Sequence, residues 1–117
     1  MKYLTADEIL SFDDTLYTEV ECPEWTPKGE KEVAKVRIRS MTTETGLAFA
    51  EALADEKPQF EVMIIAVADG VVDENGEPIF SRESIKGLAK KNIKPVQRIF
   101  NAISELSKPD VDEIEKN

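Results

Sequence analysis

The clearest candidate for a metal-binding segment is Asp73-Glu74-Asn75-Gly76, whose carboxylate and amide oxygens are ligands that Ca²⁺ accepts. In a calcium loop of the EF-hand type, the glycine is the sixth residue and a bidentate glutamate is the twelfth. Counted from Asp73, the glycine here is the fourth residue and the twelfth is Ser84. The spacing therefore favours a simple turn, and we expect no metal ion.

Nucleophilic and acid–base catalysis lack their usual residues in this chain. There is no histidine, which excludes imidazole-based triads and removes the commonest zinc ligand. The single cysteine, Cys22, has no base predicted beside it, so we expect a small apolar residue that is partly buried. Carboxylate pairs are frequent, but most of them fall in polar loops or on solvent-exposed faces: Asp7/Glu8, Asp13/Asp14, Glu19/Glu21 and Asp55/Glu56. We therefore expect a protein that is not an enzyme, with no catalytic residues and no cofactor.

The length of 117 residues suits a single globular domain, expected at 1–108, followed by a charged flexible tail at 109–117. A hydrophobic content of 41% is enough for a core. The net charge of −9 repels phosphate backbones, so nucleic-acid binding is not expected. The longest unbroken apolar run, 62–68, is much shorter than the roughly 20 residues of a membrane-spanning helix. With one cysteine and no apolar run near the start, we expect a cytoplasmic protein.

The first forty residues predict a short helix and an antiparallel hairpin. Thr5 and Glu8 have the spacing of a capping box, and Asp13-Asp14 ends the helix that they begin. Alternating side chains predict an acidic strand at 16–21 and a basic strand at 33–40. Charge pairs between these strands are expected to set their register.

Two helices are predicted in the middle of the chain. Thr42 or Thr43 caps a helix that runs to about Ala54, with one apolar face formed by Leu47, Ala50, Leu53 and Ala54. The next segment begins at Gln59 and reaches Ala68 or Val72. It is apolar on every side, which predicts the core helix, with a buried strand as the competing interpretation.

The segment 71–81 predicts a fixed bend. Asn75-Gly76 favours a tight turn with positive φ, Pro78 prevents a helix from continuing, and Ser81 can cap the next helix. That helix is expected to direct inward Ile85, Leu88 and Ala89, and to be interrupted near Lys91-Asn92. The last helix has Pro95 in its first turn, and its apolar stripe consists of Val96, Ile99, Phe100, Ile103 and Leu106. The predicted fold class is α+β, mainly α, with a short helix and a two-stranded hairpin followed by about four helices.

Four basic residues recur every four positions near the end of the chain: Lys86, Lys90, Lys94 and Arg98. A continuous helix would place them on one face, although Asn92 and Pro95 argue against continuity. Two interpretations stay open. The four residues are either a docking face for an acidic partner or for the acidic part of another copy, or a solvated face opposite the apolar stripe.

Two aromatic residues are further candidate partner contacts. Trp25 lies in a loop between Pro23 and Pro27, where it either anchors a partner or folds back as a lid on the hairpin. Phe12 belongs to the apolar edge of the first helix, together with Ile9 and Leu10.

The order and spacing of these features resemble the small tail assembly chaperones of long-tailed, siphovirus-type bacteriophages and prophages. The resemblance covers nearly the whole chain and departs from the family at Gly46 and at 89–94. It is carried by five segments: the opening 1–10, the acidic strand leading to 20–25, the basic strand 36–39, the helix start 41–43, and the bend 72–81 with its flanking helices.

This resemblance implies a non-enzymatic protein that acts in the host bacterial cytoplasm during virion assembly and is absent from the finished particle. Such chaperones are expected to bind the tape measure protein, to recruit tail tube protein, and in some cases to form a homo-oligomer. They are often paired with a longer frameshifted product. The alternative is a permanent phage component, such as a head–tail connector or a minor tail protein. A metal-dependent hydrolase or nuclease is the least supported class.

Overall fold

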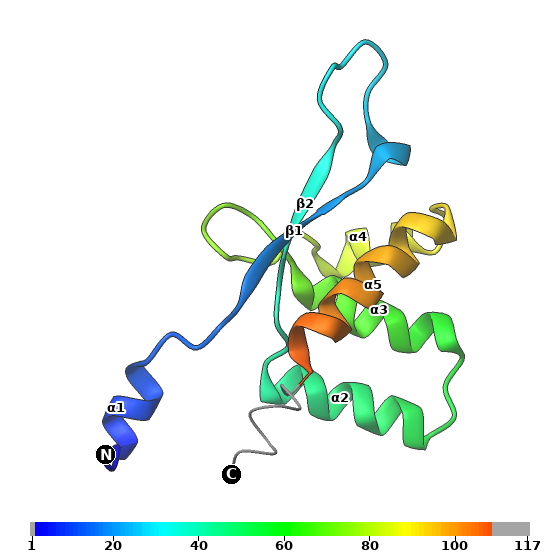
Figure 1. The fold of residues 1–117 in the computed structure, drawn as a ribbon. Helices are drawn as coiled ribbons and strands as arrows, with labels where there is room; N and C mark the ends of the chain where they lie inside the picture. Colours follow the sequence, from blue (N-terminus) through cyan, green and yellow to red (C-terminus); the bar gives the residue numbers. More distant parts are fainter. Residues whose placement is uncertain (1, 109–117) are drawn as a thin grey trace.

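The computed structural model describes residues 2–108, so the tail predicted at 109–117 lies outside the described residues. The elements, in chain order, are α1 (Ala6–Ser11), β1 (Tyr17–Glu21), the 3-10 turn η1 (Pro23–Trp25), β2 (Lys35–Arg39), α2 (Thr43–Ala54), α3 (Gln59–Gly70), β3 (Val71–Val72), α4 (Arg82–Leu88) and α5 (Ile93–Ser107) (Figure 1). The predicted α+β class with mainly helical content is confirmed. The assignment of 1–108 to one domain stays a prediction.

The sheet has three antiparallel strands in the order β1-β2-β3. The predicted hairpin of β1 and β2 is confirmed, and its register places Glu19 opposite Arg37, so the acidic strand does face the basic one. The third strand was not predicted. Val71-Val72 leaves the end of α3 and pairs with β2, with Val71 opposite Ile38. The core helix predicted from Gln59 to Ala68 or Val72 is confirmed and ends at Gly70, so the competing interpretation of the segment as a buried strand is wrong, and Val71 and Val72 begin the strand that follows.

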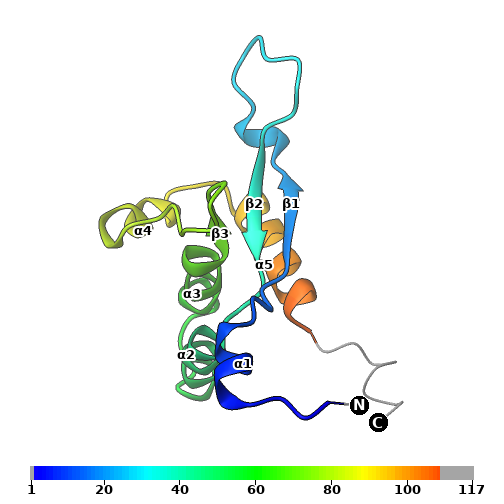
Figure 2. The same ribbon diagram turned by 90° about the vertical axis from the view of Figure 1, so that its left-hand side faces the viewer.

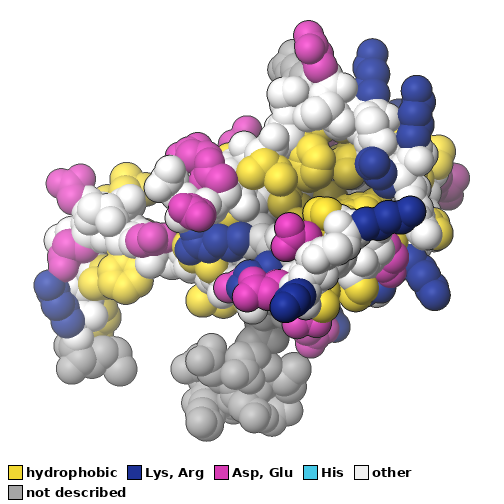
Figure 3. All heavy atoms as spheres, turned by 90° about the horizontal axis from the view of Figure 1, so that it is seen from above, with side chains coloured by type: hydrophobic (Ala, Val, Ile, Leu, Met, Phe, Trp, Pro, Cys, Tyr) yellow, Lys and Arg dark blue, Asp and Glu magenta, His cyan; other side chains and the backbone are white. Residues whose placement is uncertain are grey.

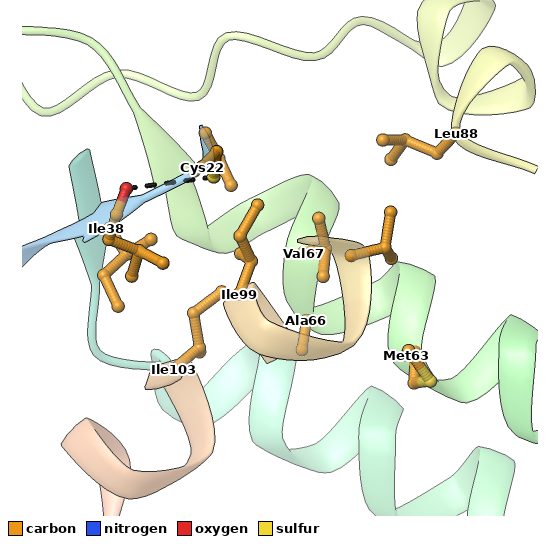
Figure 4. Close-up of a cluster of buried hydrophobic side chains, with 11 residues drawn as sticks. Cys22, Ile38, Met63, Ala66, Val67, Leu88, Ile99 and Ile103 are labelled. Atoms are coloured by element: carbon orange, nitrogen blue, oxygen red, sulfur yellow. Dashed lines mark hydrogen bonds between the residues drawn. The ribbon is translucent and has the colours of Figure 1, made fainter. Parts of the chain in front are cut away.

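One face of the sheet is covered by helices (Figures 1 and 2). α5 contacts β1 and β2, and α3 packs between α5 and α2. The core lies where these layers meet: Ile38 of β2, Ala66 and Val67 of α3, and Ile99 and Ile103 of α5 converge there (Figure 4). The predicted stripe of α5 is confirmed, because Val96, Ile99 and Ile103 are buried and Phe100 and Leu106 pack against the same cluster.

The inward face of α2 differs from the predicted one. Thr42 caps the helix as expected, but its buried residues are Thr45 and Ala52, while Phe49 stacks on Phe100 with ring centroids 5.8 Å apart. The predicted face is exposed, including Leu47 and Leu53. The inner side of α2 thus combines Thr45 and Ala52 with the half-buried Phe49, whereas Leu47 and Leu53 are mostly exposed.

The bend between β3 and α4 has the predicted turn chemistry. Gly76 has a φ of +82°, and the side-chain oxygen of Asp73 accepts hydrogen bonds from the backbone N–H groups of Asn75 (2.8 Å) and Glu77 (3.0 Å). Ser81 then caps α4 through a capping box with Ser84. α4 ends at Leu88 and α5 begins at Ile93, so the predicted interruption is confirmed. Of the three residues expected to point inward from this helix, Leu88 is buried and Ile85 is half-buried, whereas Ala89 follows the helix and is exposed.

Substitution of Gly76 tests the turn. Gly76→Ala should lower the free energy of unfolding by more than the roughly 1–2 kcal/mol that a positive φ costs an L-residue, because the new Cβ would also lie 2.9 Å from the Tyr17 hydroxyl. Gly29→Ala is the matched control, since Gly29 has a φ of +89° and no atom within 4 Å of its would-be Cβ. Urea unfolding of both variants measures the difference, and equal losses would show that the Tyr17 contact is unimportant.

Candidate interaction surfaces

The bend 73–77 is held against the sheet by two arginines of β2. Arg37 donates to the backbone carbonyl oxygens of Asp73 (3.2 Å) and Glu74 (2.8 Å), and its guanidinium lies 4.2 Å from the ring centroid of Tyr17. Arg39 donates to Asp69 Oδ1 at 2.8 Å and to the carbonyl oxygen of Asp69 at 3.1 Å. A cation at the bend would need the carbonyl oxygens of Asp73 and Glu74 and the side-chain oxygen of Asp73 as ligands. These oxygens already accept hydrogen bonds from protein groups. Among residues 2–108, no cluster of three or more carboxylate or thiol groups could hold a metal ion.

Cys22 is a free cysteine buried in the core. The residue is 1% exposed, and its thiol donates to the carbonyl oxygen of Val20 at 3.8 Å. Burial raises the pKa of the Cys22 thiol, which disfavours the thiolate that a nucleophile requires. Cys22 thus behaves as the small apolar residue that was predicted, but it is fully buried in the core cluster and not partly buried.

The loop that carries Trp25 is fixed to α5 by a bidentate ion pair. Both terminal nitrogens of Arg98 donate to the two carboxylate oxygens of Glu24, at 2.8 and 2.7 Å. Trp25 follows directly, is half-buried and packs against the core cluster. This position is the one expected of a lid on the hairpin, and a role of Trp25 in partner binding stays a prediction.

Hydrogen bonds from Arg98 lower the pKa of Glu24 from its ordinary value of 4.5 to about 2. The charged carboxylate is thus favoured in the folded state, so its stabilising effect is complete above pH 4.5 and is lost as the pH falls from about 4.5 to about 2. Glu24→Gln should lower the free energy of unfolding at pH 7 and flatten its acid dependence in that window. Urea unfolding at several pH values measures both effects. The double variant Glu24→Gln with Arg98→Gln should lose little more stability than either single variant.

The four basic candidate residues do not share a helical face. Lys86 lies in α4, Lys90 in the turn after it, and Lys94 and Arg98 in α5, so the break at 89–92 removes the continuous face on which the docking interpretation relied. Arg98 is engaged with Glu24. The three lysines are exposed and form no ion pair with any residue that the structure describes.

Within residues 2–108, two apolar surfaces open to solvent are candidates for partner binding. The first is a groove of about 340 Å³ between α2, α3 and α5, lined by Phe49, Leu53, Lys57, Gln59, Val62, Met63 and Phe100. The second is the segment 2–16, which contains Phe12 and is named the N-terminal arm below. α1 begins with the predicted capping box of Thr5 and Glu8 but buries none of its residues. Sequence reasoning found the apolar edge of α1 but could not show that nothing in the described chain covers it.

Comparison with known proteins gives a fold relationship. No family model matches the chain, and no curated protein matches its sequence. The solved structure of the bacteriophage HK97 tail assembly chaperone is similar to this chain with a TM-score of 0.64 and 18% identity, over 85% of this chain and 88% of that one. The predicted resemblance is confirmed at the level of the fold.

Proposed function

We propose that this protein is a tail assembly chaperone, which binds the tape measure protein of its phage or prophage and recruits tail tube subunits during tail assembly. The observation that carries the proposal is the likeness in fold to the HK97 tail assembly chaperone over 85% of the chain. The proposed role requires no catalytic group or cofactor and is exercised in the host bacterial cytoplasm. None of the helices within residues 2–108 has the length and apolar character to cross a membrane.

The surface of α2 and α3 supports this proposal. The groove beside Phe49 and Leu53 is apolar, and Leu47 lies exposed on the same helix. α2 contains no basic residue, and the chain carries a net charge of −9. An amphipathic helix of the tape measure protein would bury its apolar stripe in this groove, while the negative charge keeps the complex in solution. Tail tube subunits would then displace the chaperone.

Co-expression with the tape measure protein of the same phage or prophage tests the proposal. The wild-type chain should raise the soluble fraction of the tape measure protein, and Leu47→Asp with Leu53→Asp should remove most of this effect. Ile79→Asp is the matched control, because Ile79 is similarly exposed but lies in the bend before α4. Circular dichroism verifies that all variants are folded. If the wild-type chain leaves tape measure solubility unchanged, the chaperone proposal is wrong.

Mass spectrometry of purified virions separates a chaperone from a permanent component. A chaperone should be missing from the particles, whereas a head–tail connector or minor tail protein would be present in fixed proportion to tail tube protein. Detection at such a proportion would contradict the proposed role.

A further inference from the structure

The groove between α2, α3 and α5 exposes aromatic and aliphatic surface. Phe49 and Phe100, whose rings stack on each other, line it together with Met63. Leu53 also lines it and is 56% exposed. Among residues 2–108, the space of about 340 Å³ between these side chains is open. A hollow with mostly apolar walls is typical of a docking site.

The end of α5 lies beside the start of α2. The backbone N–H of Met41 donates to Ser107 Oγ at 2.9 Å, and Figure 1 shows the last turn of α5 next to the first turn of α2. At Lys108 the backbone leaves the helix in an extended conformation, with φ −69° and ψ 142°. Residues 109–117 therefore start where α2 and α5 meet, and the groove lies further along the same two helices.

The segment 109–117 is long enough to reach the groove. Phe100 lies about two turns before Ser107, which is about 10 Å along the axis of α5. Nine residues in an extended conformation span about 30 Å. The segment can therefore return along α5 beyond Phe100.

The composition of the segment matches that of the groove. Val111 and Ile114 are its aliphatic residues, and a separation of three positions places two side chains on one face of a helical turn. Four carboxylates lie around them in the sequence: Asp110, Asp112, Glu113 and Glu115. In the groove, Lys57 is the only lysine or arginine of the stretch 40–81. It forms no ion pair with any residue in the range 2–108.

A second basic surface competes for these carboxylates. Seen from above, Lys and Arg side chains gather on the side of the molecule away from the N-terminal arm (Figure 3). Exposed lysines lie in α4 and near the start of α5: Lys86, Lys90, Lys91 and Lys94. A segment bound there would have to extend along the whole of α5, about 20 Å, which orders more of the chain. The groove is closer, and burial of two aliphatic side chains contributes more than ion pairs at the surface.

We propose that residues 109–117 dock in the groove between α2, α3 and α5 of the same molecule. Val111 and Ile114 pack against Met63, and the carboxylates between them lie beside Lys57. The segment covers the surface that the proposed function assigns to a helix of the tape measure protein, so this helix must displace it. Only the displacement rests on the proposed function. The docking is a property of the single chain, and it can fail while the chaperone proposal stands.

Paramagnetic relaxation enhancement in the full chain tests the docking. A nitroxide is attached to Lys116→Cys, where it reacts selectively because Cys22 is buried. The Met63 methyl resonance should lose most of its intensity and recover it when ascorbate reduces the nitroxide. A nitroxide at Lys28→Cys is the matched control. It lies in the loop between η1 and β2, far from α2 and α3 in both ribbon views, and should leave the Met63 resonance unchanged (Figures 1 and 2).

Removal of the aliphatic side chains should release the segment. In the chain labelled at position 116, Val111→Ser with Ile114→Ser should lower the ratio of docked to free segment by about tenfold or more, because both side chains lose their burial. Most of the loss of Met63 intensity should therefore disappear. Leu10→Ser with Phe12→Ser in the N-terminal arm is the matched control, since it also replaces two apolar residues, and it should leave the loss unchanged.

Charge reversal distinguishes the groove from the lysines near the start of α5. Lys57→Glu should reduce the loss of Met63 intensity, whereas Lys90→Glu with Lys91→Glu should not. The proposal is overturned if the Met63 resonance keeps its intensity in the chain labelled at position 116, or if only the second variant changes it. A mixture of isotope-labelled wild type with a spin-labelled chain that carries no isotope should show no loss. A loss in this mixture would equally overturn the proposal, because the contact would then join two molecules.

Discussion

Ile103→Ala should lower the free energy of unfolding by about 2–5 kcal/mol, the range for truncation of a fully buried isoleucine. Ile103 is 0% exposed and lies where α5 crosses the end of α3. A Cβ added at Gly70 would lie 2.5 Å from Ile103 Cδ1, so the two helices approach closely because residue 70 has no side chain. Urea unfolding followed by circular dichroism gives the measurement.

A double-mutant cycle makes this prediction specific. Gly70→Ala alone should destabilise the protein by about 1–3 kcal/mol, because its methyl group overfills the crossing. In the Ile103→Ala background, the same methyl group enters the new cavity, so Gly70→Ala should cost much less or be stabilising. Ile99→Ala is the matched control, because Ile99 is about as buried as Ile103. The three atoms nearest a Cβ added at Gly70 all belong to Ile103, so truncation of Ile99 should not relieve the crowding at residue 70. If Gly70→Ala lowers the free energy of unfolding by the same amount in the wild type, in Ile103→Ala and in Ile99→Ala, the packing of α3 against α5 does not depend on the contact between residues 70 and 103.

The α3–α5 crossing also bears on the proposed function. The groove is lined by Val62 and Met63 of α3 and by Phe100 of α5, so its shape depends on how these helices pack. A variant that loosens the crossing without unfolding the protein should bind a helical partner less tightly. The core thus stabilises the fold and also sets the geometry of the candidate binding surface.

Features that depend on a few neighbouring residues were predictable from the sequence. The caps at Thr5, Thr42 and Ser81, and the positive φ at Gly76, follow from backbone hydrogen bonding within one turn of chain. The stripe of α5 was equally predictable, because its apolar residues repeat with a clear helical period. The resemblance in fold could be inferred because it rests on the order of such local features.

Features that depend on tertiary packing were not predictable in the same way. Val71-Val72 pairs with β2, and this pairing could be predicted only if the position of β2 were known. Two β-branched residues at the end of a helix do not reveal which strand lies beside them. The ion pair of Glu24 with Arg98 joins residues 74 positions apart. For α2, the periodicity identified an apolar face, but the face that packs inward carries Thr45, Phe49 and Ala52, and which face packs inward depends on where α3 and α5 lie.

Arg39→Ala should have the second large effect, because Arg39 connects β2 to both α3 and the bend. Its side chain is 18% exposed and that of Asp69 is 27%, so the pair is largely shielded from water. Arg39 also donates to the carbonyl oxygen of Gly76 at 3.4 Å. Removing the guanidinium leaves Asp69 without its cation, and Asp69 Oδ2 already has no partner among the described residues. We expect a loss of about 1–3 kcal/mol in the free energy of unfolding.

Three further variants distinguish the shielded ion pair from a general effect of charge. Lys35→Ala is the matched control on the same strand, because Lys35 pairs with Glu19 in an exposed position, where the loss of an ion pair should change stability little. Arg39→Lys retains the charge but cannot reach Asp69 and the bend together, so it should be intermediate. Adding Asp69→Ala to Arg39→Ala should recover part of the loss, because it removes the unpaired carboxylate. If Arg39→Ala and Lys35→Ala cost the same, the bend is held by its own turn chemistry, and Arg39 contributes no more than a surface charge.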